Sequence, residues 1–225
     1  IKLWSFLIYY DFIVFNHSRQ YWFSNNDNLE DFDKYGGAKR NDKLIKAFNY
    51  FIKKTKFNNP LLILFEYGED VEYSKQLITK LKLEPYVKWM PIMDRKNIIY
   101  GLSRATISTN SFRENAIDIG GVCYESLAAG IPHINNCKEA LENSKHKFYQ
   151  SPMIHALTEE DILNIFIDYE RNPQKYKKIG QKSKEWFDEN LGLGLAKKYA
   201  KLIELLAKDK SLGQNDKIVR GIFEK

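Results

Sequence analysis

The sequence contains 225 residues, 44% of them hydrophobic and 28% charged, a composition typical of a globular protein with a real core. Its 35 lysines and arginines outnumber 29 acids and give a net charge of +6. The lysines are scattered along predicted helices, which favours a solvated surface over a nucleic-acid interface. No apolar run reaches the ~18 residues of a membrane span. Two cysteines are too few for a disulfide framework and indicate a reducing, cytoplasmic location.

Short apolar runs separated by helical patterns predict an α/β fold. The apolar opening predicts a short helix. Because no Met begins the sequence, we expect the chain to begin partway through a longer protein, although a processed or trimmed start would look the same. The strands and helices alternate in units of roughly 25 to 30 residues, which predicts right-handed βαβ crossovers and a parallel sheet. Strands are predicted at 12–15, 61–65, 86–90, 105–108 and around Ile134, and helices at 42–54, 73–81, 95–100, 161–169, 173–190 and 195–208.

The stretch 118–134 is predicted to hold the functional site. Its glycine pair, Gly120 and Gly121, would let a ligand approach the backbone closely, and the apolar spacing that follows predicts a helix ending before Gly130. The open amino end of such a helix is a ready anion site, because its unpaired N–H groups and its dipole point at the same spot. Glu125, just behind that site, is placed to accept two sugar hydroxyls.

Residues 125–134 resemble the sugar-nucleotide signature in the second domain of retaining glycosyltransferases of family 4, which have the GT-B fold. The resemblance implies that Glu125 binds the ribose hydroxyls and that Gly120 and Gly121 admit the phosphates or the sugar. The acid that precedes the signature in the family is replaced by Ile117 here. Asp118 beside it, or Glu114 slightly earlier, is then expected to contact the hexose.

Two basic residues extend the resemblance. Arg19 follows the first predicted strand, and Lys39 opens a segment, 39–48, that matches the family's phrase before its next helix. Both residues are therefore expected to hold the donor diphosphate and to act as catalytic cations. Arg40 replaces a usual glycine, and the loop between Arg19 and Lys39 is longer than the family's.

The resemblance also predicts which residues contact the nucleobase, and the proposed chemistry bears on whether a cofactor is needed. The resemblance implies backbone contacts from Met90, Pro91 and Ile92 to the nucleobase. Fixed cations and helix N–H groups can stabilise the departing diphosphate, so no metal and no other cofactor is expected. The run 31–33, Asp-Phe-Asp, spells the acidic motif of metal-dependent glycosyltransferases of the other main fold, but no strand precedes it.

The resemblance covers roughly residues 11–207 and implies a three-layer Rossmann-like domain, one half of a GT-B fold, over 1–207. Its C-terminal helices are expected to pack on the parallel sheet, and a polar tail, 208–225, is expected to fray.

The implied function is transfer of a hexose from a UDP- or GDP-sugar, with retention, to a glycan, lipid or small-molecule acceptor. An N-terminal acceptor domain of the same polypeptide would be required for activity, and peripheral contact with the inner membrane surface is compatible with this function.

Two other classes of function remain open. A GT-B nucleotide-sugar epimerase would share the donor site. The chain could also be a non-catalytic module that binds a nucleotide sugar or a nucleic acid. A nucleic-acid binder would need clustered positive charge with exposed aromatic residues. The four histidines show no spacing that recommends any of them as a ligand or a base; they are His17, His133, His146 and His155.

Overall fold

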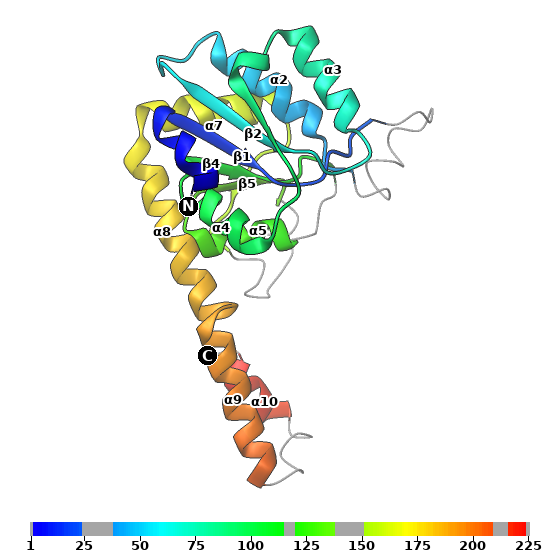
Figure 1. Ribbon diagram of the computed structural model, residues 1–225. Coiled ribbons are helices and arrows are strands. Elements are labelled where there is room, and N and C mark those ends of the chain that lie inside the picture. Colours follow the sequence, from blue (N-terminus) through cyan, green and yellow to red (C-terminus); the bar gives the residue numbers. More distant parts are fainter. Residues whose placement is uncertain (1, 24–37, 115–119, 138–150, 209–215, 224–225) are drawn as a thin grey trace.

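The computed structural model describes residues 2–23, 38–114, 120–137, 151–208 and 216–223 (Figure 1). Its centre is a six-stranded parallel sheet in the order β3-β2-β1-β4-β5-β6. The strands are β1 (Phe12–Asn16), β2 (Pro60–Phe65), β3 (Val87–Met90), β4 (Ile107–Thr109), β5 (His133–Asn135) and β6 (Ile154–His155). The predicted α/β fold with a parallel sheet is therefore confirmed.

Helices cover both faces of the sheet and extend beyond it (Figure 1). They are the 3₁₀ helices η1 (Lys2–Tyr9) and η2 (Glu84–Tyr86), and α2 (Asn41–Ile52), α3 (Val71–Leu81), α4 (Arg95–Leu102), α5 (Gly121–Ala129), α7 (Glu159–Arg171), α8 (Pro173–Asn190), α9 (Leu193–Lys208) and α10 (Asp216–Phe223). The three-layer arrangement expected from the sequence is thus present.

The central strands are buried on both faces, which explains their continuous apolar runs. Side chains alternate along a strand, so Phe12 and Val14 of β1 belong to the core under α2 and α7, whereas Ile13 and Phe15 belong to the core under η1 and α4. The β2 run follows the same alternation. Each strand therefore joins two cores, and the sheet is fixed in register by both.

The strand order also fixes where a ligand can bind. β1 pairs in parallel with β2 on one side and with β4 on the other. The connections leaving β1 and β4 therefore turn in opposite directions and leave a crevice between them at the carboxyl edge of the sheet. Open α/β sheets bind their ligands in such a crevice.

The C-terminal helices form two groups. α7 begins with a capping box in which Thr158 and Asp161 satisfy each other's backbone N–H groups. α8 packs against α5, and its Gly180 lies so close to Gly130 that a Cβ there would overlap the Gly130 carbonyl oxygen.

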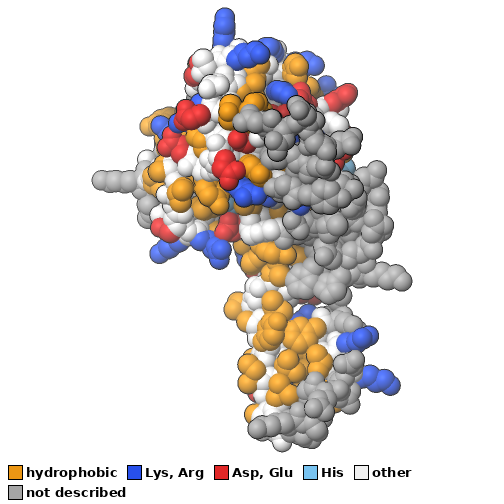
Figure 2. All heavy atoms as spheres, turned by 90° about the vertical axis from the view of Figure 1, so that its right-hand side faces the viewer, with side chains coloured by type: hydrophobic (Ala, Val, Ile, Leu, Met, Phe, Trp, Pro, Cys, Tyr) orange, Lys and Arg blue, Asp and Glu red, His pale blue; other side chains and the backbone are white. Residues whose placement is uncertain are grey.

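α9 and α10 continue away from the sheet as a projecting pair (Figure 1), and Figure 2 shows apolar side chains on their surface. The exposed side chains of α9 include Leu193, Tyr199 and Ile203. The tail expected to fray contains α10, which Ile222 and Phe223 anchor on α9. Among the described residues, no helix has the length and apolar character needed to cross a bilayer.

Candidate functional site

Glu125 lies at the switch point between β1 and β4, one turn into α5. His17, directly after β1, places Nε2 2.8 Å from one carboxylate oxygen of Glu125, Oε2. Arg95, the first residue of α4, donates Nε–H to the other, Oε1, over 2.7 Å. Three elements that are distant in sequence therefore meet at one carboxylate.

The two partners of Glu125 differ in exposure. The His17 side chain is 2% exposed and the Glu125 side chain 14%, whereas the Arg95 side chain is 77% exposed. Burial alone would raise the pKa of Glu125, but the hydrogen bonds and charges of His17 and Arg95 outweigh it and hold the pKa below its usual range. Glu125 is thus an ionised acceptor with one buried and one exposed partner, and each oxygen keeps a further lone pair for a ligand.

A pocket of about 330 Å³ opens beside this carboxylate. His17, Gly121 and Glu125 supply its polar side, and the other lining residues are apolar or aromatic: Phe65, Tyr67, Ile92, Met93, Ile98 and Val122. Small-molecule sites typically combine mostly apolar walls with a few polar groups that fix orientation. The pocket therefore combines apolar contact with a hydroxyl acceptor.

The glycine pair at the start of α5 has no conformational or packing role among the described residues. Gly120 has φ −89° and ψ −179°, an extended backbone that any residue adopts. A Cβ built on Gly120 or on Gly121 meets no described atom within 4 Å. None of the described residues therefore fills the space beside the helix amino end, and an anion there would meet small residues and backbone N–H groups.

Lys39 and Arg19 both lie at this edge of the sheet. The backbone N–H of Lys39 donates to the carbonyl of Tyr21, and the Arg19 guanidinium lies 4.6 Å from the centre of the Tyr21 ring. Burial raises the pKa of Cys123 to about 11, and the charge of Lys39 opposes that rise. Lys39 and Arg19 are therefore both joined to Tyr21 at the carboxyl edge of the sheet.

The segment after β3 is only partly at the pocket. Ile92 lines it, together with Met93, which the sequence did not single out. Met90 is buried, and its carbonyl already accepts the N–H of Glu66 over 2.9 Å. Pro91 is exposed to solvent and does not line the pocket.

Four residues named in the sequence analysis lie outside the described part of the chain: Asp31, Asp33, Ile117 and Asp118. Glu114 is described and is an exposed turn residue.

A buried polar network supports the crevice from below. Asn16 donates to the Thr109 hydroxyl over 2.9 Å and accepts from the Ser18 hydroxyl over 3.0 Å. Asn41, at the start of α2, donates to Ser18 and accepts the N–H of Tyr21 over 3.1 Å. These bonds tie the ends of β1 and β4 to the start of α2, so the backbone around His17 and Arg19 is preorganised.

Two further titratable groups are buried behind α5. His133 Nε2 lies 3.2 Å from Cys123 Sγ, and His133 Nδ1 lies 2.8 Å from the Ser108 hydroxyl. Burial, with the charge of His17, lowers the pKa of His133 to about 3, and burial also raises the pKa of Cys137 to about 12. At neutral pH the imidazole is therefore uncharged and the thiols are protonated, and both cysteines belong to the core that packs under α5.

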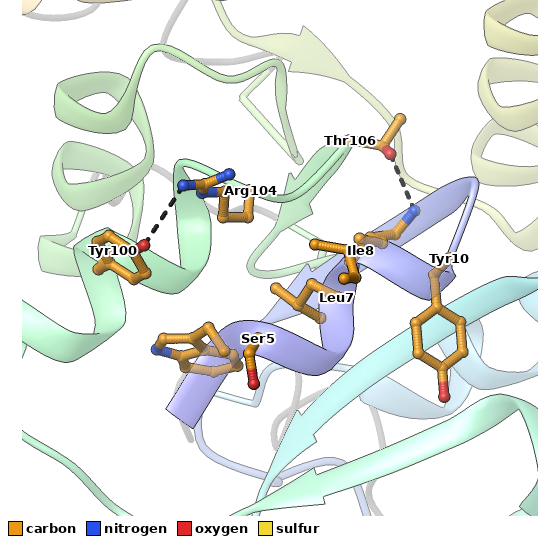
Figure 3. Close-up of a pocket in the computed structure, with 9 residues that line it drawn as sticks. Ser5, Leu7, Ile8, Tyr10, Tyr100, Arg104 and Thr106 are labelled. Atoms are coloured by element: carbon orange, nitrogen blue, oxygen red, sulfur yellow. Dashed lines mark hydrogen bonds between the residues drawn. The ribbon is translucent and has the colours of Figure 1, made fainter. Parts of the chain in front are cut away.

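A second hollow, of about 400 Å³, lies at the opposite edge of the sheet, where β1 and β4 begin (Figure 3). Leu7 and Ile8 of η1 line it, together with Tyr100 of α4 and Arg104 just after that helix. None of the residues predicted for the site lines it. Among the described residues, no group of three or more His, Cys, Asp or Glu side chains is arranged to hold a metal ion.

Sequence reasoning missed His17. The spacing of His17 to the other histidines predicts no role as a ligand or a base. Its partner is instead Glu125, 108 positions away. The sequence does contain one signal for His17, which is its position directly after a predicted buried strand. This position lies at the carboxyl edge of the sheet, where the helix that bears Glu125 begins.

Neither protein-family models nor curated proteins matched the sequence. Solved structures share its fold. The Anabaena protein HepE, in complex with UDP, has 17% identical residues and a TM-score of 0.64, over 91% of this chain and 52% of HepE. The pneumococcal O-GlcNAc transferase GtfA, in complex with UDP and GlcNAc, has 15% identity and a TM-score of 0.58, over 88% of this chain and 36% of GtfA.

The C-terminal domain of LpcC from Francisella tularensis, a glycosyl transferase group 1 family protein, has 13% identity and a TM-score of 0.55, over 78% of this chain and 83% of that domain. The fold is that of a Rossmann-like domain of the GT-B type. The chain spans about half the length of HepE and about a third of GtfA.

Proposed function

We propose that this chain is the donor-binding half of a GT-B glycosyltransferase and that the pocket beside Glu125 receives a nucleoside-diphosphate sugar. The observation that carries the proposal is the convergence of an ionised carboxylate, an apolar pocket and an open helix amino end at one switch point. Fold similarity to proteins solved with UDP supports the same assignment.

Each part of the ligand has a matching part of the site. The base lies against the apolar wall that includes Ile92 and Met93, and the ribose hydroxyls donate to Glu125. The diphosphate lies at the N–H groups of Gly120 and Gly121, where the helix dipole favours negative charge. Lys39 and Arg19 add positive charge at the same edge.

The proposed chemistry follows from where charge develops. Cleavage of the bond between sugar and phosphate leaves a negative charge on the diphosphate, and preorganised cations and N–H groups stabilise that charge in the transition state. Arg19 and Lys39 would supply this stabilisation without a metal ion. The donor would be a UDP- or GDP-hexose, the anomeric configuration would be retained, and the acceptor would be bound jointly with an N-terminal domain.

Glu125→Gln tests the ribose contact. The substitution keeps the shape and one acceptor oxygen but removes the charge, so affinity for UDP should fall by about 1–3 kcal/mol in calorimetric titration. The 2′-deoxy nucleotide lacks part of the contact already, so its affinity should fall less, and the two changes should be non-additive. Equal losses for the ribo and deoxy ligands would contradict the assignment.

Arg19→Ala and Lys39→Ala test the diphosphate contact. A charge-assisted hydrogen bond to phosphate contributes about 1.5–3 kcal/mol, so each variant should weaken binding of UDP much more than of uridine. Lys53→Ala, an exposed lysine at the far end of α2, is the matched control and should change neither affinity. Equal effects on nucleotide and nucleoside would show that the two cations do not contact the diphosphate.

A further inference from the structure

Three aromatic side chains, two of them exposed and one half-buried, form a cluster at the carboxyl edge of the sheet, beside the nucleotide pocket. The rings of Phe23 and Tyr73 are stacked, with centroids 4.0 Å apart and planes at 22°, and each residue is 37% exposed. Trp22 lies edge-on to Phe23 at 5.9 Å. We call Trp22, Phe23 and Tyr73 the aromatic platform.

Buried polar groups hold this platform in place. The carboxylate of Asp70, a residue only 5% exposed, accepts the backbone N–H groups of Trp22 and Phe23 over 2.6 and 2.9 Å. The Trp22 indole N–H donates to the hydroxyl of Ser74 over 2.8 Å.

The neighbouring loops add to this restraint. Gln20 exchanges backbone hydrogen bonds with the segment 67–70, and Gly68, at φ 110°, approaches Gln20 so closely that no side chain would fit. Exposed aromatic residues that are fixed in this way are preorganised for contact, which reduces the entropy lost on binding.

The charges around the platform select the class of ligand. Three acids, Glu66, Glu69 and Glu72, lie exposed in the segment between β2 and Tyr73, and Lys75 pairs with the first and the last over 3.2 and 3.1 Å. On the Tyr73 side of the platform, away from Arg19 and Lys39, these acids outnumber the lysine and oppose a phosphate backbone, whereas carboxylates are good acceptors for hydroxyl groups. A ring with an apolar C–H face and hydroxyls around its rim fits both features.

We propose that the aromatic platform binds a pyranose ring of a neutral glycan, and that this glycan is the acceptor. The first part stands on the platform alone, and the second part rests on the proposed function. The link is spatial: Tyr67, whose carbonyl accepts the N–H of Gln20, lines the nucleotide pocket, and Tyr21 lies under the Arg19 guanidinium. A sugar on the platform is therefore next to the site proposed for the donor diphosphate.

Saturation-transfer NMR on the full chain tests glycan binding without any nucleotide. The probes are maltohexaose, cellohexaose and chitohexaose, with single-stranded oligothymidylate as the nucleic-acid comparison. At least one hexasaccharide should receive saturation, and Phe23→Ala and Tyr73→Ala should each weaken its binding by about tenfold. Phe23→Tyr and Tyr73→Phe keep the rings and should keep the binding.

Tyr50→Ala is the matched control, because Tyr50 is 47% exposed on α2 and lies toward the other edge of the sheet. This variant should bind the glycan like the unchanged protein, and a thermal melt should show that all the variants are folded. No saturation of any hexasaccharide, equal losses in Tyr50→Ala, or a preference for oligothymidylate would overturn the proposal. UDP titration of the platform variants should be unchanged, so this result is separate from a failure of the donor site.

Discussion

Replacing Gly121 with alanine should separate the stability of the protein from its binding of a nucleotide. Gly121 is the first residue of α5, and a Cβ there meets no described atom within 4 Å. The fold therefore gains a better helix former without strain. Unfolding should require up to about 1 kcal/mol more free energy, and never less than in the unchanged protein.

The same methyl group occupies the space proposed for the diphosphate. An added group in a filled site typically costs about 1–3 kcal/mol, which corresponds to a loss of about 5- to 140-fold in affinity. Calorimetric titration with UDP and GDP measures the affinity, and thermal unfolding without ligand measures the stability.

Gly221→Ala provides the matched control. Gly221 also meets no described atom within 4 Å, but it lies in α10, away from the sheet. This substitution should stabilise the protein slightly and leave nucleotide affinity unchanged. Unchanged affinity in Gly121→Ala, with the expected gain in stability, would refute the reasoning that a ligand approaches the backbone at this helix.

Three further predictions concern stability and metal dependence. Gly180→Ala forces a Cβ onto the Gly130 carbonyl, so it should lower the free energy of unfolding by about 1–3 kcal/mol, as measured by urea titration. An unchanged free energy of unfolding would exclude the close contact of α8 with α5. Lys175, with Asn172 and Tyr176, lowers the pKa of Asp168 to about 2. A lowered pKa stabilises the fold above the unfolded value of about 3.9 and loses that effect as pH falls toward about 2. The stability deficit of Asp168→Asn should therefore be constant above this window and shrink within it; a deficit independent of pH would contradict this. Binding of UDP should survive EDTA, since the proposed site uses cations and N–H groups; loss on chelation, restored by Mg²⁺, would require a metal-dependent site.

Much of the fold could be predicted because its signals are local. The β1 and β2 runs are short, apolar and bounded by polar residues, and the structure contains strands at Phe12–Asn16 and Pro60–Phe65. β6 was missed, because a two-residue strand, Ile154–His155, has no periodicity to detect. The run 158–161, a threonine followed by three acids, predicts a helix start, and α7 does begin at Glu159 behind the Thr158 cap.

The site was only partly predictable, because its contacts join distant segments. The glycine pair and Glu125 form a local pattern and could be identified in the sequence. The partners of Glu125 could not, since His17 and Arg95 reach it only after β1, β4 and α4 are in place. The aromatic platform could not be predicted for the same reason. Phe23 and Tyr73 are separated by 50 positions and meet only when the segments after β1 and β2 lie side by side.

The contact between Gly180 and Gly130 gives α5 two unlike ends. Its amino end is open, whereas its carboxyl end is held backbone to backbone against α8. Gly130 and Gly180 leave no room for a side chain between the two backbones, so the carboxyl end of α5 cannot shift toward α8 unless α8 moves as well. α8 leads within a few residues into α9, so this contact joins the helix that bears Glu125 to the projecting helices (Figure 1).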